Sequence, residues 1–421
     1  MYTLFIAVLV LLPFQYIVVL PGGVEAVRVL AVLLSLGWLI GYLSDPRNRG
    51  RIASKAPYWC AGMIAATAIA VPFGVDPAAS VVRWGRFVVL WLGFLIAVPA
   101  TLDGDRAWRR AALCYLAAGA VFGLLNYSDY LLAPASLARE IAANPTGFVI
   151  RNAFAFEGGA AGHGHEVGHF ASFAILMGLG LVLSARARVE RWLLIGLLVV
   201  ATGALLISFT KSAWAGLGVG VMAFYWRALR RTPLGEQAAR VARWSWLPIL
   251  VIFSLAAGFW FALPMQTRGW LIQNFLFGDV SGLQRLALWK GALRLALDHP
   301  LVGVGLNSVR LVTGDPHNWW LEMLAEGGPL ALACALAFFW RLWRELAPGD
   351  SAVALDVRMI RGAAAATVLS IAFQGLFEAS FLWDFPTWVA LGLATAVAGW
   401  PAPRLIEDAP AMAQRDAALE P

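Results

Sequence analysis

The sequence predicts an all-α polytopic membrane protein, and three observations lead to this fold class. Apolar residues make up 60% of the 421-residue chain, whereas soluble domains usually contain about 45–50%. These residues gather in runs of about 20, the length that a membrane-spanning helix needs. Only 14% of the chain is charged, and the net charge of +7 suits anionic headgroups or phosphates better than a nucleic acid. A soluble enzyme and a nucleic-acid-binding protein are therefore excluded.

Twelve apolar runs predict about twelve transmembrane helices. The first run precedes every basic residue and lacks a small-residue cleavage site, so we expect it to be retained as a span. An even number of spans places both termini on the same side of the membrane. The runs lie near residues 3–20, 27–43, 57–73, 84–100, 108–125, 167–184, 191–208, 212–229, 246–263, 328–343, 361–378 and 384–400.

The distribution of basic residues predicts the orientation of these spans. Alternate connections and the C-terminal tail hold 21 of the 32 Lys and Arg residues. Basic connections stay in the cytoplasm, so both termini are expected there. The two long connections, near 126–166 and 264–327, then lie on the outer face. All five histidines fall in or beside them, which makes the outer face the expected place of chemistry.

The second long connection contains a predicted helix. Ser281-Gly282-Leu283-Gln284 has the form of a capping box, and Pro300 ends the pattern after Asp298. One side of this helix is polar and carries Arg285, Trp289, Lys290, Arg294 and Asp298; the other carries Leu283, Leu286, Ala287, Leu293 and Leu297. Two interpretations stay open: a helix lying in the membrane interface, or an amphipathic helix packed against the protein.

A second helix is predicted to follow Asp315-Pro316. Because Pro316 disfavours helix at Asp315, we expect His317 in the first helical turn, at the water boundary. A neutral imidazole there can accept a proton from an attacking hydroxyl near neutral pH. Asn318 and Glu322 are placed to orient the imidazole or a substrate. The alternative is a histidine that is merely interfacial.

These residues resemble a known family. The run Arg285…Trp289…His299-Pro300-Leu301…Gly303-Val304-Gly305…His317-Asn318…Leu321…Glu326…Gly328 is similar to the signature loop of the O-antigen ligase and polymerase superfamily of the Wzy-C type, and is most like an O-antigen ligase. The likeness spans about 45 residues and is otherwise mainly topological. Ala331 stands where the family pattern has a further glycine.

The resemblance implies a glycosyltransferase of the GT-C-like kind in the bacterial inner membrane. Such enzymes move a glycan from undecaprenyl diphosphate to an acceptor at the periplasmic face, with inversion and without a metal or other cofactor. A ligase uses a lipid A–core acceptor, whereas a lipid-linked O-antigen or exopolysaccharide polymerase extends a second carrier-linked glycan. With the apolar runs, this predicts nine spans within 1–263, including a periplasmic loop at about 126–166, then a large periplasmic loop with the catalytic motif at 264–327, three spans within 328–400 and a cytoplasmic tail at 401–421.

The resemblance also implies roles for individual residues. His317 is the expected catalytic histidine, and Arg285 is expected to bind the donor diphosphate. Lys211, within Phe209-Thr210-Lys211-Ser212-Ala213-Trp214, stands where the family carries an arginine, so the charge is kept without the bidentate fork. Weaker substrate-binding candidates are Trp289, Asn318, Arg151, His169, Lys290 and Arg294; the basic ones suit a phosphate-rich acceptor.

A different class of enzyme is raised by His165-Glu166-Val167-Gly168-His169, which matches H-E-x-x-H. On a helix this motif would hold zinc, with Glu166 as the base of an intramembrane metalloprotease. The surrounding glycines at 158, 159, 162, 164 and 168 disfavour that helix, and no third ligand is evident. A transporter would show charged spans or repeated halves, and neither is apparent.

Overall fold

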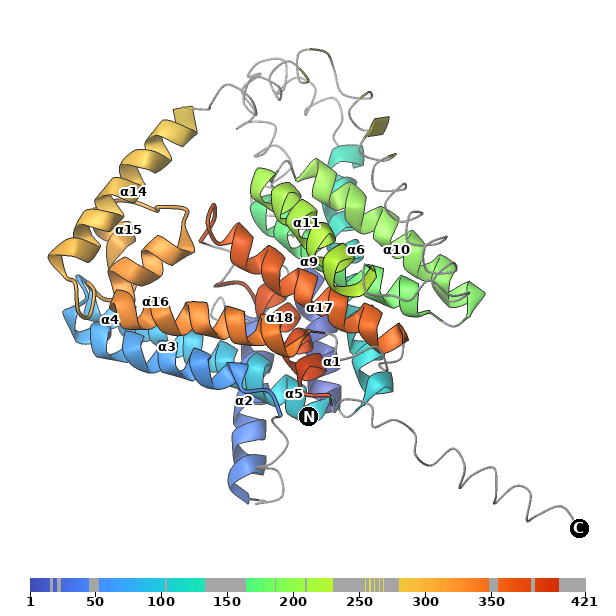
Figure 1. The fold of residues 1–421 in the computed structure, drawn as a ribbon, viewed down its shortest axis with the longest axis horizontal. Coiled ribbons are helices and arrows are strands. Elements are labelled where there is room, and N and C mark those ends of the chain that lie inside the picture. The colour runs from blue at the N-terminus through green and yellow to red at the C-terminus, as the bar shows by residue number, and fades with distance from the viewer. Residues whose placement is uncertain are drawn as a thin grey trace, which may run out of the picture.

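The computed structural model describes residues 1–15, 18–20, 24–44, 53–102, 104–132, 164–185, 187–208, 210–229, 280–347, 355–379 and 383–400, with a few isolated positions between 254 and 268. In these ranges the chain is mostly helical, with connecting loops and one short antiparallel strand pair (Figure 1). The predicted all-α polytopic class is thereby confirmed.

The first half of the chain forms helices that follow the apolar runs closely. They are α1 (Tyr2–Leu11), η1 (Leu12–Phe14), α2 (Ala26–Ser44), α3 (Ala56–Ala70), η3 (Val71–Phe73), α4 (Pro77–Leu90), the π-helical η4 (Trp91–Ala97), α5 (Val98–Thr101) and α6 (Asp105–Leu132). The strands β1 (Val19–Leu20) and β2 (Val24–Glu25) connect α1 to α2.

The second half adds a similar set. It contains α9 (Gly164–Ser184), α10 (Arg188–Ile207), α11 (Lys211–Phe224), the π-helical η5 (Tyr225–Leu229), α14 (Val280–Asp298), α15 (Ser308–Val312), α16 (Trp319–Glu345), α17 (Leu355–Gln374) and α18 (Phe385–Ala398). The helix predicted from the capping box is α14, with nearly the expected bounds.

Seven of the described helices are long and apolar enough to cross a membrane. Eleven of the twelve predicted runs overlap described helices. The ninth run, 246–263, lies largely outside the described residues, so the total of twelve stays a prediction. The seven candidate spans are Ala26–Ser44, Ala56–Phe73, Pro77–Thr101, Asp105–Leu125, His165–Ser184, Arg188–Leu206 and Trp319–Glu345.

The first and fourth predicted spans are among those whose bounds differ in the structure. The run 3–20 is not one helix: α1 ends at Leu11, a 3-10 turn with Pro13 follows, and β1 then pairs with β2. Proline has no N–H to continue a helix. The run 84–100 begins too late, because Asp76 caps α4 by accepting a hydrogen bond from the Ala79 amide at 3.0 Å. The added turns carry Arg83, which an apolar window leaves out.

Helix α9 lies at the centre of the bundle, and 94% of its apolar 18-residue stretch is buried. It packs against α17, α10, α6 and α11, while α3 and α16 run alongside each other. Close approach depends on small residues: a Cβ on Gly180 would lie 2.5 Å from the Ala363 methyl, and one on Gly216 would overlap the Gln374 side chain. The tight packing fixes the helix ends that carry the site.

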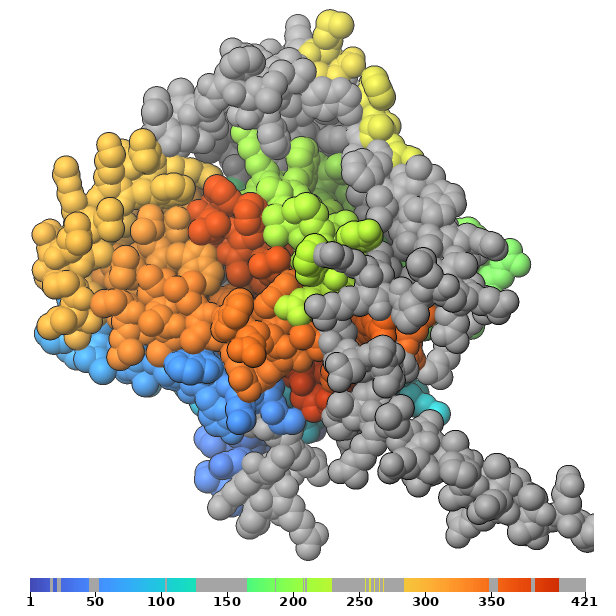
Figure 2. Space-filling view, in the orientation of Figure 1, coloured from blue at the N-terminus to red at the C-terminus, as the bar shows by residue number. Residues whose placement is uncertain are grey.

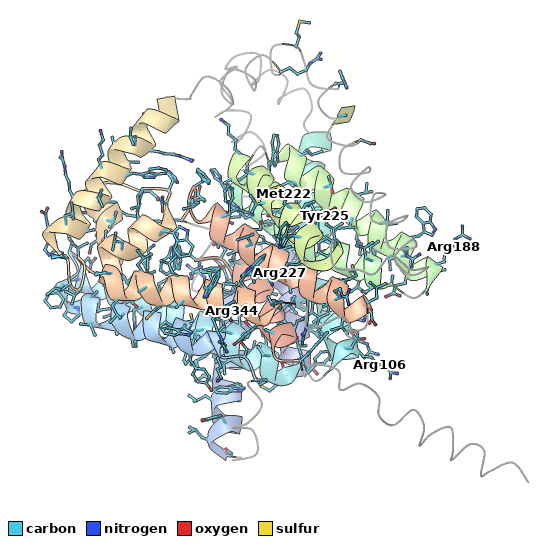
Figure 3. All side chains as sticks on the ribbon, viewed as in Figure 1. Arg106, Arg188, Met222, Tyr225, Arg227 and Arg344 are labelled. Atoms are coloured by element: carbon cyan, nitrogen blue, oxygen red, sulfur yellow. The ribbon has the colours of Figure 1, made fainter. Side chains whose placement is uncertain are left out.

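The two ends of the bundle differ in chemistry. At one end, Arg109 bonds Asp105 and the Ser184 hydroxyl and lies 3.4 Å from Asp356. Arg106 and Arg188 lie on the side of the molecule away from α14 (Figure 3). The opposite end carries the starts of α9, α11 and α16 together with the end of α17. Which side of the membrane each end faces stays a prediction.

Candidate active site

The Gly303-Val304-Gly305 segment repairs a break in α16. Gly328 has non-helical angles (φ 77°, ψ 177°) and Pro329 follows it. Since Pro329 has no N–H, the Ala325 carbonyl lacks its helical donor. The Val304 amide donates to that carbonyl at 2.8 Å, and the next amide donates to the Glu326 carbonyl at 3.0 Å. The loop is therefore tied to the helix at the break.

The same loop rests on the turn between α3 and α4. The Val75 amide donates to the Ser308 hydroxyl at 3.0 Å, and the Ser80 hydroxyl donates to the Leu306 carbonyl at 2.6 Å. Gly305 has φ +83°, and a Cβ there would lie 2.4 Å from the Gly74 Cα. Only a residue without a side chain fits between these backbones.

His317 is held in a left-handed conformation just before α16. Its φ is 48°, and its amide donates to Asp315 Oδ1 at 2.8 Å. The predicted position in the first helical turn is therefore wrong. Asn318 is the N-cap, its Oδ1 accepting from the Leu321 amide at 3.1 Å. An asparagine cap satisfies a helix-start donor, which leaves the preceding imidazole pointing out of the helix.

Glu378, beyond the end of α17, faces the imidazole. Its Oε1 lies 3.2 Å from His317 Nδ1, and its side chain is 3% exposed against 36% for His317. The other carboxylate oxygen lies 3.8 Å from His165 Nδ1. The hydrogen bond to Glu378 raises the pKa of His317, and the charges of Glu378 and Asp315 add to this, while burial and Arg285 oppose it.

This contact also indicates the tautomer of His317. An ionised carboxylate can accept a hydrogen bond but cannot donate one, so opposite an ionised Glu378 the proton is on Nδ1. The lone pair of a neutral ring then lies on Nε2. Glu378 was missed by the sequence, where an acidic residue after a span has the ordinary interpretation of a solvated turn.

Helix α14 brings two predicted residues to His317. Arg285 Nη1 donates to the Phe377 carbonyl at 3.3 Å, next to Glu378, and Trp289 Nε1 donates to the Pro316 carbonyl at 2.7 Å. The structure thus brings Arg285, Trp289 and His317 together from segments that the sequence separates.

The packing face of α14 is not the leucine side. Ala292 and Ala296 are buried in a small cluster with Val304, Val309 and Ala325. Leu286, Leu293 and Leu297 are 47%, 45% and 68% exposed, as are Lys290 and Arg294 to a large extent. The helix forms an outer edge of the molecule (Figure 2). The outward leucines favour the membrane-interface interpretation over a packed amphipathic helix.

Lys211 is the first residue of α11. The N-cap Thr210 uses its hydroxyl on the Ser208 carbonyl at 3.2 Å and not on the helix start. The first-turn amides and the lysine therefore share one end of α11. This end touches the start of α9, where a Cβ on Gly168 would lie 2.7 Å from Thr210 Cβ. Arg151 lies outside the described residues.

The H-E-x-x-H residues lie on α9 after all, since the helix includes Gly164 and Gly168. His169 is 2% exposed and its Nδ1 contacts the Gln374 side-chain oxygen, deep between α9 and α17. His165 instead faces Glu378. Among the residues that the structure describes, no group of three or more His, Cys, Asp or Glu is placed to hold a metal. No observation here favours a zinc protease.

Comparison with known families gives an independent result. Residues 196–336, about a third of the chain, match the family model described as Wzy_C, O-antigen ligase. The chain carries an O-antigen ligase family domain. No curated protein matches the sequence closely enough to be counted. The O-antigen ligase domain includes Arg285, His317 and Lys211.

This match confirms the resemblance and indicates the broad activity. The domain is that of a glycosyltransferase-like enzyme of O-antigen or polysaccharide processing, and the apolar helices indicate a membrane protein. Glu378 and His165, which face each other in the candidate site, lie outside the matched O-antigen ligase domain. The site is therefore larger than the domain.

Proposed function

We propose that the protein is an O-antigen ligase. It transfers a glycan from undecaprenyl diphosphate to a lipid A–core acceptor at the periplasmic face of the bacterial inner membrane. The proposal rests above all on one observation: Arg285 on α14 and His317 in the turn before α16 meet the adjacent residues Phe377 and Glu378. A cation for the diphosphate and a base for the acceptor are thus within reach of one substrate.

His317 acts as the general base. Nδ1–H donates to Glu378 and Nε2 accepts the proton of the acceptor hydroxyl. The hydroxyl oxygen forms its bond to the anomeric carbon while the carbon–oxygen bond to the diphosphate breaks on the opposite face. The configuration is inverted, undecaprenyl diphosphate leaves, and Glu378 stabilises the imidazolium that forms.

The leaving diphosphate gains negative charge as its bond to the sugar breaks. Arg285 supplies a guanidinium next to the base, and Lys211 supplies an ammonium at the start of α11. Cations held in advance where charge develops are a large source of transition-state stabilisation.

The acceptor and the lipid carrier approach along α14. Lys290 and Arg294 offer exposed charges to the phosphates of a lipid A–core acceptor, and the leucine stripe rests in the outer leaflet. Trp289, Asn318 and Arg151 remain further candidates for substrate contact, whereas the burial of His169 between α9 and α17 argues against that residue. Asn318 is also largely buried, and its Oδ1 serves as the helix cap.

Reconstitution of the purified protein tests this function. The protein in liposomes receives undecaprenyl-diphosphate-linked glycan and rough lipopolysaccharide. Glycan on the lipopolysaccharide is the expected result; chain growth on the carrier would instead make the enzyme a polymerase. H317A is expected to abolish transfer and R285A to slow it strongly, while both variants remain folded in the membrane; full turnover by both would overturn the proposed mechanism.

A further inference from the structure

An arginine of α4 contacts the far side of the catalytic loop. Arg83 is 11% exposed and lies with Nη2 2.7 Å from Glu322 Oε1. Its Nη1 donates to Asn307 Oδ1 at 3.0 Å and lies 3.8 Å from Glu326 Oε2. Its guanidinium also stacks over Trp383, 3.8 Å from the ring centroid. One side chain thus joins the start of α16, the 303–307 loop and the segment before α18.

A second arginine extends these contacts to the base. Arg310 Nε lies 3.3 Å from the same Glu322 oxygen, and its Nη2 lies 3.1 Å from Asp315 Oδ2. The other oxygen of Asp315 accepts the His317 amide at 2.8 Å. Three ion pairs therefore link Arg83, Glu322, Arg310 and Asp315, and a hydrogen bond to the backbone amide continues the series to His317.

The series of contacts acts on the backbone conformation of His317. A left-handed conformation is unfavourable for a residue with a side chain, so the His317 backbone relaxes unless its neighbours hold it. Asp315 holds it directly, and Arg310 fixes the direction of Asp315. Glu322 is 1% exposed, and a buried carboxylate shared by two guanidinium groups is fixed in turn.

We propose that Arg83 and Arg310 are positioning residues of the active site, which hold His317 against Glu378 through Glu322 and Asp315. Neither arginine touches the reacting atoms. The inference rests on the proposed function only in taking His317 as the base. If it is correct, breaking the series at Arg83 on α4 displaces an imidazole that lies in the turn before α16.

The test combines kinetics with a measurement that needs no turnover. In R83Q we expect kcat to fall about 100-fold, the loss typical of a displacement of about 1 Å at a reacting group, with a much smaller change in KM. The pKa of His317, measured by NMR on histidine-labelled protein and assigned with H317Q, is expected to fall. The Glu378 hydrogen bond raises it, and a loosened turn weakens that bond. The other charges facing the ring are Asp315 and Arg285.

Controls separate positioning from charge compensation. R109Q removes an arginine that is similarly paired at the opposite end of the bundle and is expected to leave kcat and the His317 pKa unchanged. The double variant R83Q/E322Q removes both buried charges. We expect it to stay slow because Arg310 loses its ion pair with Glu322; recovery of wild-type kcat would overturn positioning in favour of simple neutralisation.

The outcomes keep this inference distinct from the proposed function. If the wild type transfers no glycan, the function fails, while the His317 pKa still tests the series. If R83Q does not fold, R310Q decides, since Arg310 is 31% exposed and tolerates replacement more easily. An unchanged His317 pKa in whichever variant folds would overturn the inference.

Discussion

Replacing Glu378 by glutamine tests the base directly. In E378Q the amide oxygen still accepts a hydrogen bond from Nδ1–H, so the ring orientation is kept and only the charge is removed. A hydrogen bond to a charged group contributes about 1.5–3 kcal/mol. The lower end applies, because the Nδ1–Oε1 distance is 3.2 Å and the imidazole is 36% exposed to screening water.

About 1.4 kcal/mol corresponds to one pKa unit, so the pKa of His317 is expected to fall by about one unit in E378Q. The wild-type enzyme needs neutral His317 and loses activity as the pH drops through the raised pKa. In the variant, this acid limb moves to lower pH by about one unit. The plateau of kcat/KM is expected to fall about 10- to 100-fold, because the imidazolium formed during transfer loses its counter-charge.

Initial rates of glycan transfer in liposomes, taken across a series of pH values, measure both effects. E345Q is the matched control, since Glu345 accepts bonds from Ser54 and the Lys55 amide at the other end of the bundle. Because His165 also faces Glu378, H165Q is measured beside it. An acid limb that stays in place in E378Q would refute the role of this carboxylate.

Three further predictions concern the loop, the donor site and the metal. G303A forces a side chain into a left-handed backbone (φ +73°), 2.6 Å from the Ala325 carbonyl. We expect a loss of more than about 1–2 kcal/mol in stability, whereas G218A, with open space around it, melts like wild type. R285A is expected to lower kcat about 10²- to 10³-fold by removing charge stabilisation; the exposed R188A serves as its control, and equal rates would contradict the assignment. Addition of a chelator is expected to leave transfer unchanged, and loss of activity restored by zinc would return the metalloprotease interpretation.

Much of the fold is readable from the sequence because each helix depends on its own residues. Apolar runs give the spans, and the box at Ser281 gives the start of α14. The packing face of α14 is not readable in this way. Periodicity shows that a helix has an apolar side, but it does not show whether protein or lipid covers that side, and here the small residues Ala292 and Ala296 make the protein contact.

The residues of the candidate site likewise divide into those that a local pattern predicts and those that it does not. His317 and Arg285 belong to a local pattern, so the resemblance could point to both. Glu378 lies 61 residues from His317 and Arg83 lies 239 residues from Glu322. A single sequence holds no signal that joins such distant positions. Taken alone, Glu378 and Arg83 each look like a charged residue at the ordinary end of a span.

The packing of the 303–307 loop against the α3–α4 turn limits how this active site can be transferred to another protein. A graft of residues 196–336 into a relative would import Gly305 without the bare backbone of Gly74 beneath it. It would also leave Glu378 and Arg83 behind. Swapping acceptor preference between enzymes of this kind therefore requires exchanging the receiving turn and the distant carboxylate along with the recognised segment.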